Sequence, residues 1–347
     1  MQVRPLHEKI SVIIPVYNGG EAFRRCLAHL SVADPSPEEI IVVADGDTDG
    51  SRELAQEFGA QVLINPSPRG PANARNWAAI HARCDILFFV DADVALPPDA
   101  LSHIITTFQE EPQLAALIGS YDDAPAASNF LSQYKNLLHH YVHQTSREEA
   151  STFWGACGAI RREVFLQLGG FDGEKYARPS IEDIELGYRL KRAGYRIRLV
   201  KELQVKHLKR WDAFSLVKTD FFQRALPWTE LILHDQAFVN DLNLQTSSRL
   251  SVALTFGLVA ALPLARRAFV CAIIGLLASG LFVLNVDLYQ FFWRKRGFCF
   301  MLRAIAWHWF YYFYSGLAFA FIFVRLGPHP PQPPSPNSGR GGSLTLK

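Results

Sequence analysis

Two aspartates separated by one residue, Asp91 and Asp93, directly follow the apolar run Ile86–Val90. Side chains alternate along an extended strand, so alternate residues at its end face the same side. Two carboxylates held together suit a hard divalent cation, Mg²⁺ or Mn²⁺, which completes its shell with water and phosphate oxygens. The pair therefore predicts a metal site that takes a nucleotide diphosphate, and an ordinary loop is the competing interpretation.

Polar residues also follow two other apolar runs near the N-terminus. Asp45 comes directly after Ile40–Ala44, where an acidic side chain can accept a hydrogen bond from a base or a ribose. Pro15 and Tyr17 lie at the tip of the first apolar run and form a rigid, partly aromatic edge suited to packing on a nucleobase. A plain strand-ending turn is the alternative at this tip.

Arg75 lies early in the helix that Arg69-Gly70-Pro71 introduces. A guanidinium and a helix N-terminus can both bind phosphate oxygens there, and a surface salt bridge is the alternative. His207 follows the strand-like segment Leu203–Lys206 and is a candidate further metal ligand, although a lone histidine is more often structural.

The segments that carry these residues alternate between strands and amphipathic helices. The pattern predicts strands at Ser11–Pro15, Ile40–Ala44, Gln61–Ile64, Ile86–Val90 and Ala115–Ile118, and helices at Glu21–Leu30, Asp49–Phe58, Pro71–Ala82 and from Pro98. This alternation is typical of an α/β fold, a Rossmann-like, mostly parallel sheet with helices on both faces. The carboxyl ends of parallel strands converge on one ligand site, which is where the polar residues stand.

The C-terminal part differs in composition, because three stretches free of Asp, Glu, Lys and Arg occur there. Ala268–Val286 and Ala304–Val324 are each long enough alone for the roughly 20 residues that cross a bilayer. Leu250–Ala265 is shorter and contains Pro263, so a span and a buried or re-entrant helix both remain open. Aromatic residues crowd one end of the last stretch, as at a membrane interface: Trp307, Trp309, Tyr311, Tyr312 and Tyr314. We expect two or three transmembrane helices.

The first apolar run, Ile10–Val16, is short and interrupted by Pro15, so we expect no secretory signal and a cytoplasmic catalytic domain in a multi-pass membrane protein. Basic residues between the last two stretches agree with this topology, whereas Arg266 and Arg267 do not. A net charge of +2 without a basic run argues against nucleic acid as a partner. The five cysteines lack metal-ligand spacing and are interpreted as reduced.

Two further segments bear on the domain organisation. Residues 128–146 have the pattern of an amphipathic helix, which either packs on the core of the catalytic domain or lies on the membrane surface near an acceptor tunnel. The tail from Pro328 is rich in proline and glycine and is expected to be disordered. We divide the chain into a catalytic domain at residues 1–248, a membrane region at 249–326 and a tail at 327–347.

Six motifs in a fixed order carry a family resemblance: PVYNGG, ADGDTDGS, GPANARN, DAD, GACGAIRREVFLQLGGFD and EDIELGYRLKRAGYRI. Through them, residues 10–210 resemble a family-2 inverting glycosyltransferase of the GT-A fold. The resemblance implies nucleotide-sugar contacts from Pro15, Tyr17, Asp45, Arg75, Asp91 and Asp93, the last two also on the metal. It places Asp183 on the catalytic base of the family, with helix capping as the alternative role.

The resemblance also implies an acceptor side that includes Trp154, Gly155 and Glu182. The small residues after Trp154 would let a sugar lie close to the backbone, and Trp154 itself would stack on the acceptor or pack in the core. The chain departs from the family in two motifs. The usual double acid is Ala44-Asp45 here, which leaves the nucleotide open. The QxxRW of processive synthases keeps only its last two residues, in Leu208-Lys209-Arg210-Trp211, which favours transfer of a single sugar.

We therefore expect a membrane-anchored enzyme that transfers one sugar, with inversion, from a nucleotide-sugar donor to a lipid or a lipid-linked glycan. The donor is expected to be UDP-linked and the cofactor to be Mg²⁺ or Mn²⁺. A polyprenyl-phosphate sugar transferase is the enzymatic alternative, with Lys206, Lys209 and Arg210 binding the acceptor phosphate. A catalytically silent membrane scaffold of the same fold is the alternative from another class.

Overall fold

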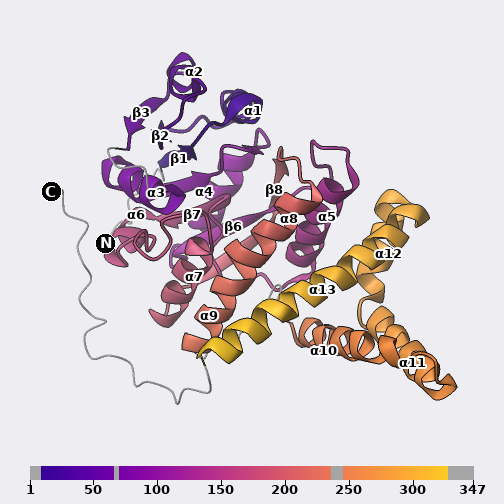
Figure 1. The fold of residues 1–347 in the computed structure, drawn as a ribbon. Coiled ribbons are helices and arrows are strands. Elements are labelled where there is room, and N and C mark those ends of the chain that lie inside the picture. The colour runs from indigo at the N-terminus through magenta and orange to yellow at the C-terminus, as the bar shows by residue number, and fades with distance from the viewer. Residues whose placement is uncertain (1–8, 66–69, 236–244, 327–347) are drawn as a thin grey trace. The chain divides into compact units, whose positions relative to one another are not determined.

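The computed structural model of the chain describes residues 9–65, 70–235 and 245–326 (Figure 1). These residues form two compact units, the first from residues 9–128 and 147–210, the second from residues 129–146 and from 211 onward. The tail expected to be disordered, and Arg69 of the predicted phosphate-binding turn, lie outside the described residues.

A mixed sheet of eight strands forms the centre of the first unit, in the order β3-β2-β1-β4-β7-β6-β8-β5. The strands are β1 Ile10–Val16, β2 Glu39–Ala44, β3 Gln61–Ile64, β4 Ile86–Val90, β5 Val94–Ala95, β6 Ala116–Tyr121, β7 Cys157–Arg161 and β8 Ile197–His207. The first four strands are mutually parallel, and β6 is parallel to β8, whereas β7 runs antiparallel to both of its neighbours. The predicted α/β fold is confirmed, and β5 and β7 are strands that the sequence pattern missed.

Helices cover both faces of this sheet because alternate residues of its strands point to opposite sides. In β1, Val12 and Ile14 contribute to the core under α1, α2 and α4, while Ile13 contributes to the core under α3, α6 and α7. The helices are α1 Gly20–Leu30, α2 Ser51–Glu57, α3 Gly70–His81, α4 Ala100–Glu110, α6 Arg162–Gln167 and α7 Glu182–Arg192.

The second unit is helical. Its elements are α5 Phe130–Thr145, α8 Ala213–Lys218, the π-helix η1 Thr219–Ala225, α9 Leu226–Asp235, α10 Thr246–Ala261, the 3₁₀ helix η3 Leu262–Leu264, α11 Ala268–Leu284, α12 Val286–Arg296 and α13 Phe298–Leu326. Tyr134 and Leu137 of α5 belong to one apolar core with Tyr289 of α12 and Met301 of α13. Residues 129–146 therefore contribute to the core of the second unit.

Buried polar contacts hold these helices together. Lys135 of α5 donates to Asp220 of η1 at 2.7 Å, and the Tyr314 hydroxyl of α13 donates to the same carboxylate at 3.1 Å. The Tyr312 hydroxyl donates to Asn285 at 2.7 Å. Tyr312 and Tyr314 are therefore buried inside the unit, although the sequence placed them in an interfacial aromatic belt.

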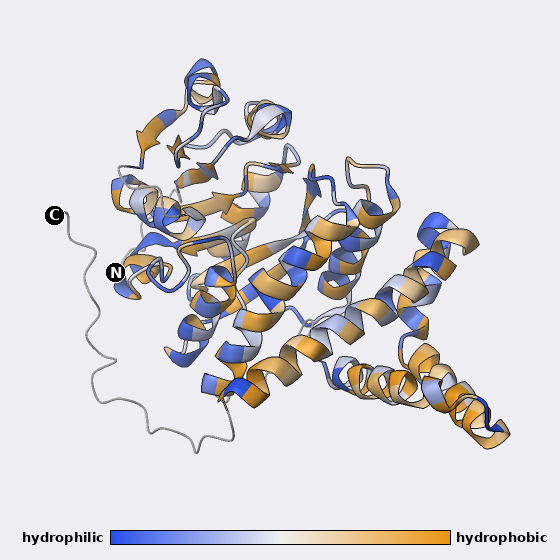
Figure 2. Cartoon of the chain, in the orientation of Figure 1, coloured by the Kyte–Doolittle hydropathy of each residue, from blue (hydrophilic) through white to orange (hydrophobic). Residues whose placement is uncertain are grey.

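Two helical segments are long and apolar enough to cross a membrane, Thr246–Leu264 and Phe298–Leu326 (Figure 2). The first contains most of the short stretch Leu250–Ala265, because the helix already begins at Thr246 and Pro263 falls in its last turn. Ala268–Val286, in contrast, is not one straight span. It is divided at Asn285 between α11 and α12, which are bent by 66° and form one broken span or a re-entrant loop.

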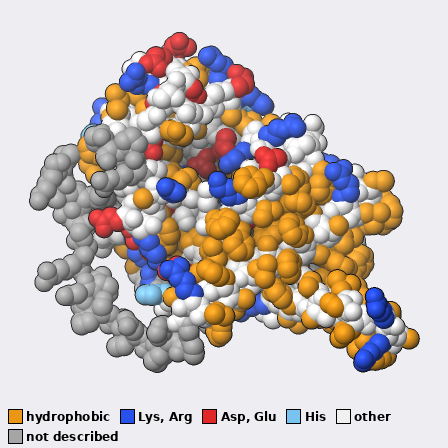
Figure 3. Space-filling view, viewed as in Figure 1, with side chains coloured by type: hydrophobic (Ala, Val, Ile, Leu, Met, Phe, Trp, Pro, Cys, Tyr) orange, Lys and Arg blue, Asp and Glu red, His pale blue; other side chains and the backbone are white. Residues whose placement is uncertain are grey.

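The surface of the second unit is strongly apolar. Figure 3 shows hydrophobic side chains over most of its visible face, and Leu276 of α11 and Val324 of α13 are 74% and 81% exposed. Such a large apolar surface is typical of a face that contacts lipid or another protein. All five cysteines of the chain are free, in agreement with the sequence.

Candidate active site

Asp91 and Asp93 lie at the carboxyl end of β4, which is buried along its whole length. A tight turn follows the strand, because the Val94 N–H donates to the Asp91 carbonyl at 3.0 Å. The Asp91 side chain is 37% exposed and that of Asp93 is 31% exposed. Burial raises the pKa of the Asp93 carboxyl above its usual range, and Lys209 partly offsets this effect. Both predicted metal ligands are therefore accessible at the end of a central strand.

An aromatic row lies beside Asp93. The Asp93 Oδ2 is 3.9 Å from Nε2 of His207, the last residue of β8. The His207 ring stacks on Tyr121 at 4.4 Å between centroids, and Tyr121 meets Trp154 edge to face at 4.8 Å. The sequence interpretation missed Tyr121. The predicted strand Ala115–Ile118 ended three residues too early, and β6 extends to Tyr121, so its place at a strand end was not visible in the pattern.

The side chains available as metal ligands determine which kind of metal fits at Asp91 and Asp93. Among residues 9–65, 70–235 and 245–326, no group of three or more His, Cys, Asp or Glu side chains is placed to enclose a metal ion. Two accessible carboxylates near an imidazole supply only part of a shell, and their oxygen atoms are hard ligands. The residues therefore fit Mg²⁺ or Mn²⁺ that also binds diphosphate oxygens and water, and not a metal that the protein encloses.

Arg75 of α3 connects the metal-site carboxylate to the start of α7. It is only 4% exposed, and its guanidinium donates to Asp91 Oδ1 at 2.5 Å and to Glu182 Oε1 at 3.0 Å. Burial alone would lower the pKa of Arg75, but Asp91, Glu182 and Asp183 hold it above its usual value, so the guanidinium stays charged. A salt bridge of the ordinary surface kind is thus excluded, since the Arg75 guanidinium and Glu182 are buried.

Asp183 is held at the start of α7 by backbone donors. Its Oδ2 accepts the Gly155 N–H at 3.0 Å and its Oδ1 accepts the Ile184 N–H at 2.8 Å. Burial, together with the neighbouring carboxylate of Glu182, raises the pKa of Asp183 to about 6. The N-cap of the helix is Ile181, which makes no side-chain cap, so Asp183 is not the capping residue. A carboxyl that titrates near neutral pH is suited to accept a proton.

Gly155 lies next to both Arg75 and Asp183. A Cβ at Gly155 would lie 3.2 Å from Cζ of Arg75, closer than most side-chain contacts allow. Its N–H is at the same time the donor to Asp183. The absence of a side chain at this position therefore lets the backbone hold Asp183 against a buried arginine.

Asp45 forms a separate group at the end of β2. It is 8% exposed and accepts hydrogen bonds from Asn65 Nδ2 at 2.7 Å and from the Gly70 N–H at 3.0 Å. Gly70 has a φ of 81°, and a Cβ there would lie 2.7 Å from the Ala177 carbonyl oxygen. Asp45 thus holds the start of α3, the helix that carries Arg75. Asn65, which sequence reasoning missed, follows the predicted strand β3.

Pro15 and Tyr17 lie at the tip of β1. Pro15 pairs with the parallel strand β2, and the Tyr17 side chain is 67% exposed. Asn18 next to it has a φ of 50° and accepts the Thr48 N–H at 2.8 Å, which joins the tip of β1 to the loop after β2. An exposed ring beside a fixed turn is free to pack on a planar ligand.

The sequence-predicted residues thus form three groups in the first unit. Hydrogen bonds join Asp91 to Glu182 through Arg75, and Gly155 to Asp183, the residue after Glu182. His207 lies 3.9 Å from Asp93, and ring contacts join it to Trp154 through Tyr121. Asp45 is linked to Asn65 and Gly70. Pro15 and Tyr17 have no direct contact with these groups that would assign them a role.

Comparison with known proteins shows which proteins the chain resembles. Residues 11–169 match the model of the family described as glycosyl transferase family 2. A probable glycosyltransferase, YdaM, from Bacillus subtilis is 28% identical over 206 residues, which are 55% of this chain and 48% of that protein. A poly-beta-1,6-N-acetyl-D-glucosamine synthase from Staphylococcus aureus is 26% identical over 204 residues with the same coverage. The chain spans about half the length of these curated relatives.

Solved structures resemble the chain more distantly. The mannosyltransferase PcManGT from Pyrobaculum calidifontis, in complex with GDP-Man and Mn²⁺, is 19% identical, with a TM-score of 0.47 over 80% of this chain and 86% of that one. S. aureus TarS 1–349 in complex with UDP-GlcNAc is also 19% identical, with a TM-score of 0.48 over 65% and 64%. The family match over residues 11–169, together with the mixed sheet and its strand-end aspartates, identifies the first unit as a glycosyltransferase domain of the GT-A fold that is similar to glycosyl transferase family 2.

Proposed function

We propose that the chain is a membrane-anchored enzyme that transfers a single sugar, with inversion, from a nucleotide-sugar donor to a lipid or lipid-linked glycan. The observation that carries this proposal is the bonded set Asp91, Arg75 and Glu182, with Asp183 and its pKa of about 6 at its end. A donor-side carboxylate and a candidate base are thus coupled through one buried arginine.

An inverting sugar transfer needs a base on the acceptor side and charge stabilisation on the donor side. The acceptor hydroxyl oxygen attacks the anomeric carbon on the face opposite the diphosphate, the bond from that carbon to the diphosphate oxygen breaks, and Asp183 takes the hydroxyl proton. Gly155 holds the Asp183 carboxylate in place during this transfer. Because the attack and the departure occur on opposite faces, the product has the inverted configuration.

On the donor side, Asp91 and Asp93 would hold Mg²⁺ or Mn²⁺, which when bound neutralises charge on the departing diphosphate. Pro15, Tyr17 and Asp45 would contact the nucleoside. Arg75 belongs to this side through Asp91, and in the structure its guanidinium binds carboxylates where we expected phosphate. We therefore propose that it orients the metal ligand. Trp154 and Glu182, with His207 near Asp93, would border the acceptor and the metal.

Membrane attachment favours a lipid-borne acceptor. The apolar surface of the second unit and its two or three candidate spans support an anchor in residues 249–326. The proposal of a cytoplasmic domain in residues 1–248 rests on the sequence pattern. The choice of a UDP-linked donor and of a single transfer rests on the motifs alone.

The two alternatives make different demands on the chain. A polyprenyl-phosphate acceptor would need basic side chains free to bind phosphate, and Lys206 already donates to Asp122 at 2.6 Å. A silent scaffold would have no use for a carboxyl with a raised pKa next to a buried arginine. Neither alternative has an observation that favours it.

The test is a panel of nucleotide sugars offered to the full chain in detergent with Mn²⁺ and a lipid extract. We expect sugar to enter the lipid fraction from at least one donor, with the opposite anomeric configuration by NMR. Retention of the configuration would exclude a direct displacement by an Asp183-activated hydroxyl, and no turnover of any donor would favour the scaffold.

A further inference from the structure

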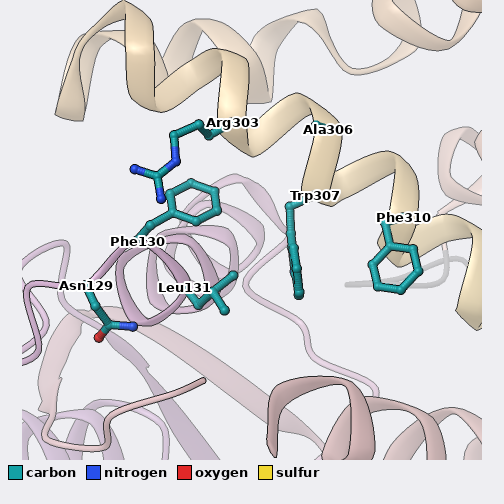
Figure 4. A pocket seen from close by; sticks show the side chains of 7 residues that line it. All are labelled: Asn129, Phe130, Leu131, Arg303, Ala306, Trp307 and Phe310. Atoms are coloured by element: carbon teal, nitrogen blue, oxygen red, sulfur yellow. The ribbon is translucent and has the colours of Figure 1, made fainter. Parts of the chain in front are cut away.

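A groove of about 650 Å³ lies between α5 and α13 within the second unit (Figure 4). Its volume is in the range of small-molecule sites in proteins. The described residues that line it are mainly apolar or aromatic: Asn129, Phe130, Leu131, Arg303, Ala306, Trp307 and Phe310. Asn129 is the one uncharged polar residue and Arg303 the one charged residue among them.

The position of Arg303 along α13 places it at a membrane boundary if this helix crosses the bilayer. The charge-free stretch Ala304–Val324 begins directly after Arg303 and ends directly before Arg325. At about 1.5 Å per residue the stretch is roughly 30 Å long, which is the thickness of the hydrocarbon core. In a spanning α13, Arg303 and Arg325 would therefore lie at opposite interfaces, and Phe310 would lie roughly 10 Å deeper than Arg303.

Arg303, Trp307 and Phe310 follow each other at intervals of four and three residues, which puts them on one face of the helix. Figure 4 shows these three side chains on the same side of α13, with Phe130 and Leu131 of α5 opposite them. The groove therefore begins with a cation at the headgroup level and continues with aromatic and aliphatic side chains toward the hydrocarbon core.

The cation in the groove is held in place but not neutralised by its surroundings. Cζ of Arg303 lies 4.2 Å from the centroid of the Phe130 ring, a cation–π contact that fixes the guanidinium over α5. None of the described lining residues is acidic. The Arg303 guanidinium is thus available, and an anion is its complement.

We propose that this groove binds an anionic phospholipid, with the phosphate at Arg303 and an acyl chain along Leu131, Trp307 and Phe310. A phosphate accepts strong, charge-assisted bonds from a guanidinium, and a hydrocarbon chain matches the apolar walls. The site is independent of sugar transfer. It depends only on α13 spanning the bilayer, and a carbonate wash of membranes tests that separately.

The experiment uses the full chain in vesicles of phosphatidylcholine into which lipid with brominated acyl chains is titrated, because bromine quenches tryptophan fluorescence on contact. Subtracting the signal of Trp307→Phe isolates the quenching of Trp307. We expect brominated phosphatidylglycerol to quench Trp307 at a mole fraction about five- to tenfold lower than brominated phosphatidylcholine does.

Three variants test the cause of this preference. Arg303→Gln should abolish it, Arg303→Lys should retain most of it because the charge stays, and Arg325→Gln is the matched control at the opposite interface and should leave it unchanged. Equal quenching by both lipids in the wild type would overturn the proposal. So would a preference that survives in Arg303→Gln or that Arg325→Gln also removes. Quenching by neither lipid would show that another part of the protein fills the groove, which also overturns it.

Discussion

Replacing Asp183 by Asn should stabilise the protein relative to the wild type, by an amount that grows as the pH rises. The pKa of Asp183 is raised to about 6, and that of an aspartate in an unfolded chain is about 3.9. The folded state therefore prefers the protonated carboxyl. Its contribution to stability is fully present below about pH 4 and is lost as the pH rises through about 6. An Asn does not ionise and avoids this loss.

The size of the effect follows from the difference in pKa. Two pKa units correspond to about 3 kcal/mol, which is an upper limit for complete burial. Asp183 keeps some exposure and two backbone hydrogen bonds, so we expect about 1–2 kcal/mol. For a unit of this size, that corresponds to a change of roughly 2–8 °C in the midpoint of thermal unfolding.

The assay compares unfolding midpoints of the wild type and Asp183→Asn, as full chains in detergent, between pH 4 and pH 8. The loss of one hydrogen bond in the variant shifts its midpoint equally at every pH, so the change of the difference with pH isolates the ionisation. Asp85→Asn, which removes an exposed carboxylate of the same unit, is the matched control and should show no such trend. A difference that stays constant across this pH range would refute the raised pKa and the role of Asp183 as a base.

Four further outcomes follow from the same geometry. The kcat of the wild type should fall about tenfold per pH unit below about pH 6, as the base becomes protonated, and a flat profile to pH 5 would contradict this. Gly155→Ala should lower kcat about 10- to 100-fold, because a Cβ crowds Arg75 and shifts the donor to Asp183, whereas Gly275→Ala, with open space around it, should match the wild type. Asp93→Ala should weaken donor binding measured in Mn²⁺, and full turnover in excess EDTA would remove the metal from the account. The full chain should stay with membranes after a carbonate wash, and its release would show that α10 and α13 do not anchor it.

The sequence predicts the parts of the fold that depend on local pattern. β3 and β4 have the bounds expected from their apolar runs, since a buried strand is readable without its partners. β7 was missed because Cys157–Arg161 contains glycine and alanine, and only its place between β4 and β6 makes it a strand. At the split of Ala268–Val286, Asn285 donates to Ser251, 34 residues away, a contact that the local pattern does not reveal.

The candidate site also combines features that a local sequence pattern predicts with features that depend on contacts between distant residues. Strand-end aspartates are visible in a pattern, and the structure places Asp45 and Asp91 where the pattern put them. The contact between Arg75 and Glu182 joins residues 107 positions apart, which the sequence pattern cannot show. The sequence analysis therefore predicted phosphate oxygens as the partner of Arg75. The raised pKa of Asp183 is also a property of packing, because it arises from burial beside Glu182.

The most direct test of the account measures donor affinity and kcat for Asp183→Asn in the full chain, with the donor that the nucleotide-sugar panel identifies. A base acts on the acceptor proton in the transition state, so we predict nearly unchanged donor affinity with kcat reduced about 10²–10⁴-fold. A folded variant with kcat close to that of the wild type would contradict the assignment of Asp183 as the base. A loss of donor affinity equal to the loss of turnover would place Asp183 in the donor site.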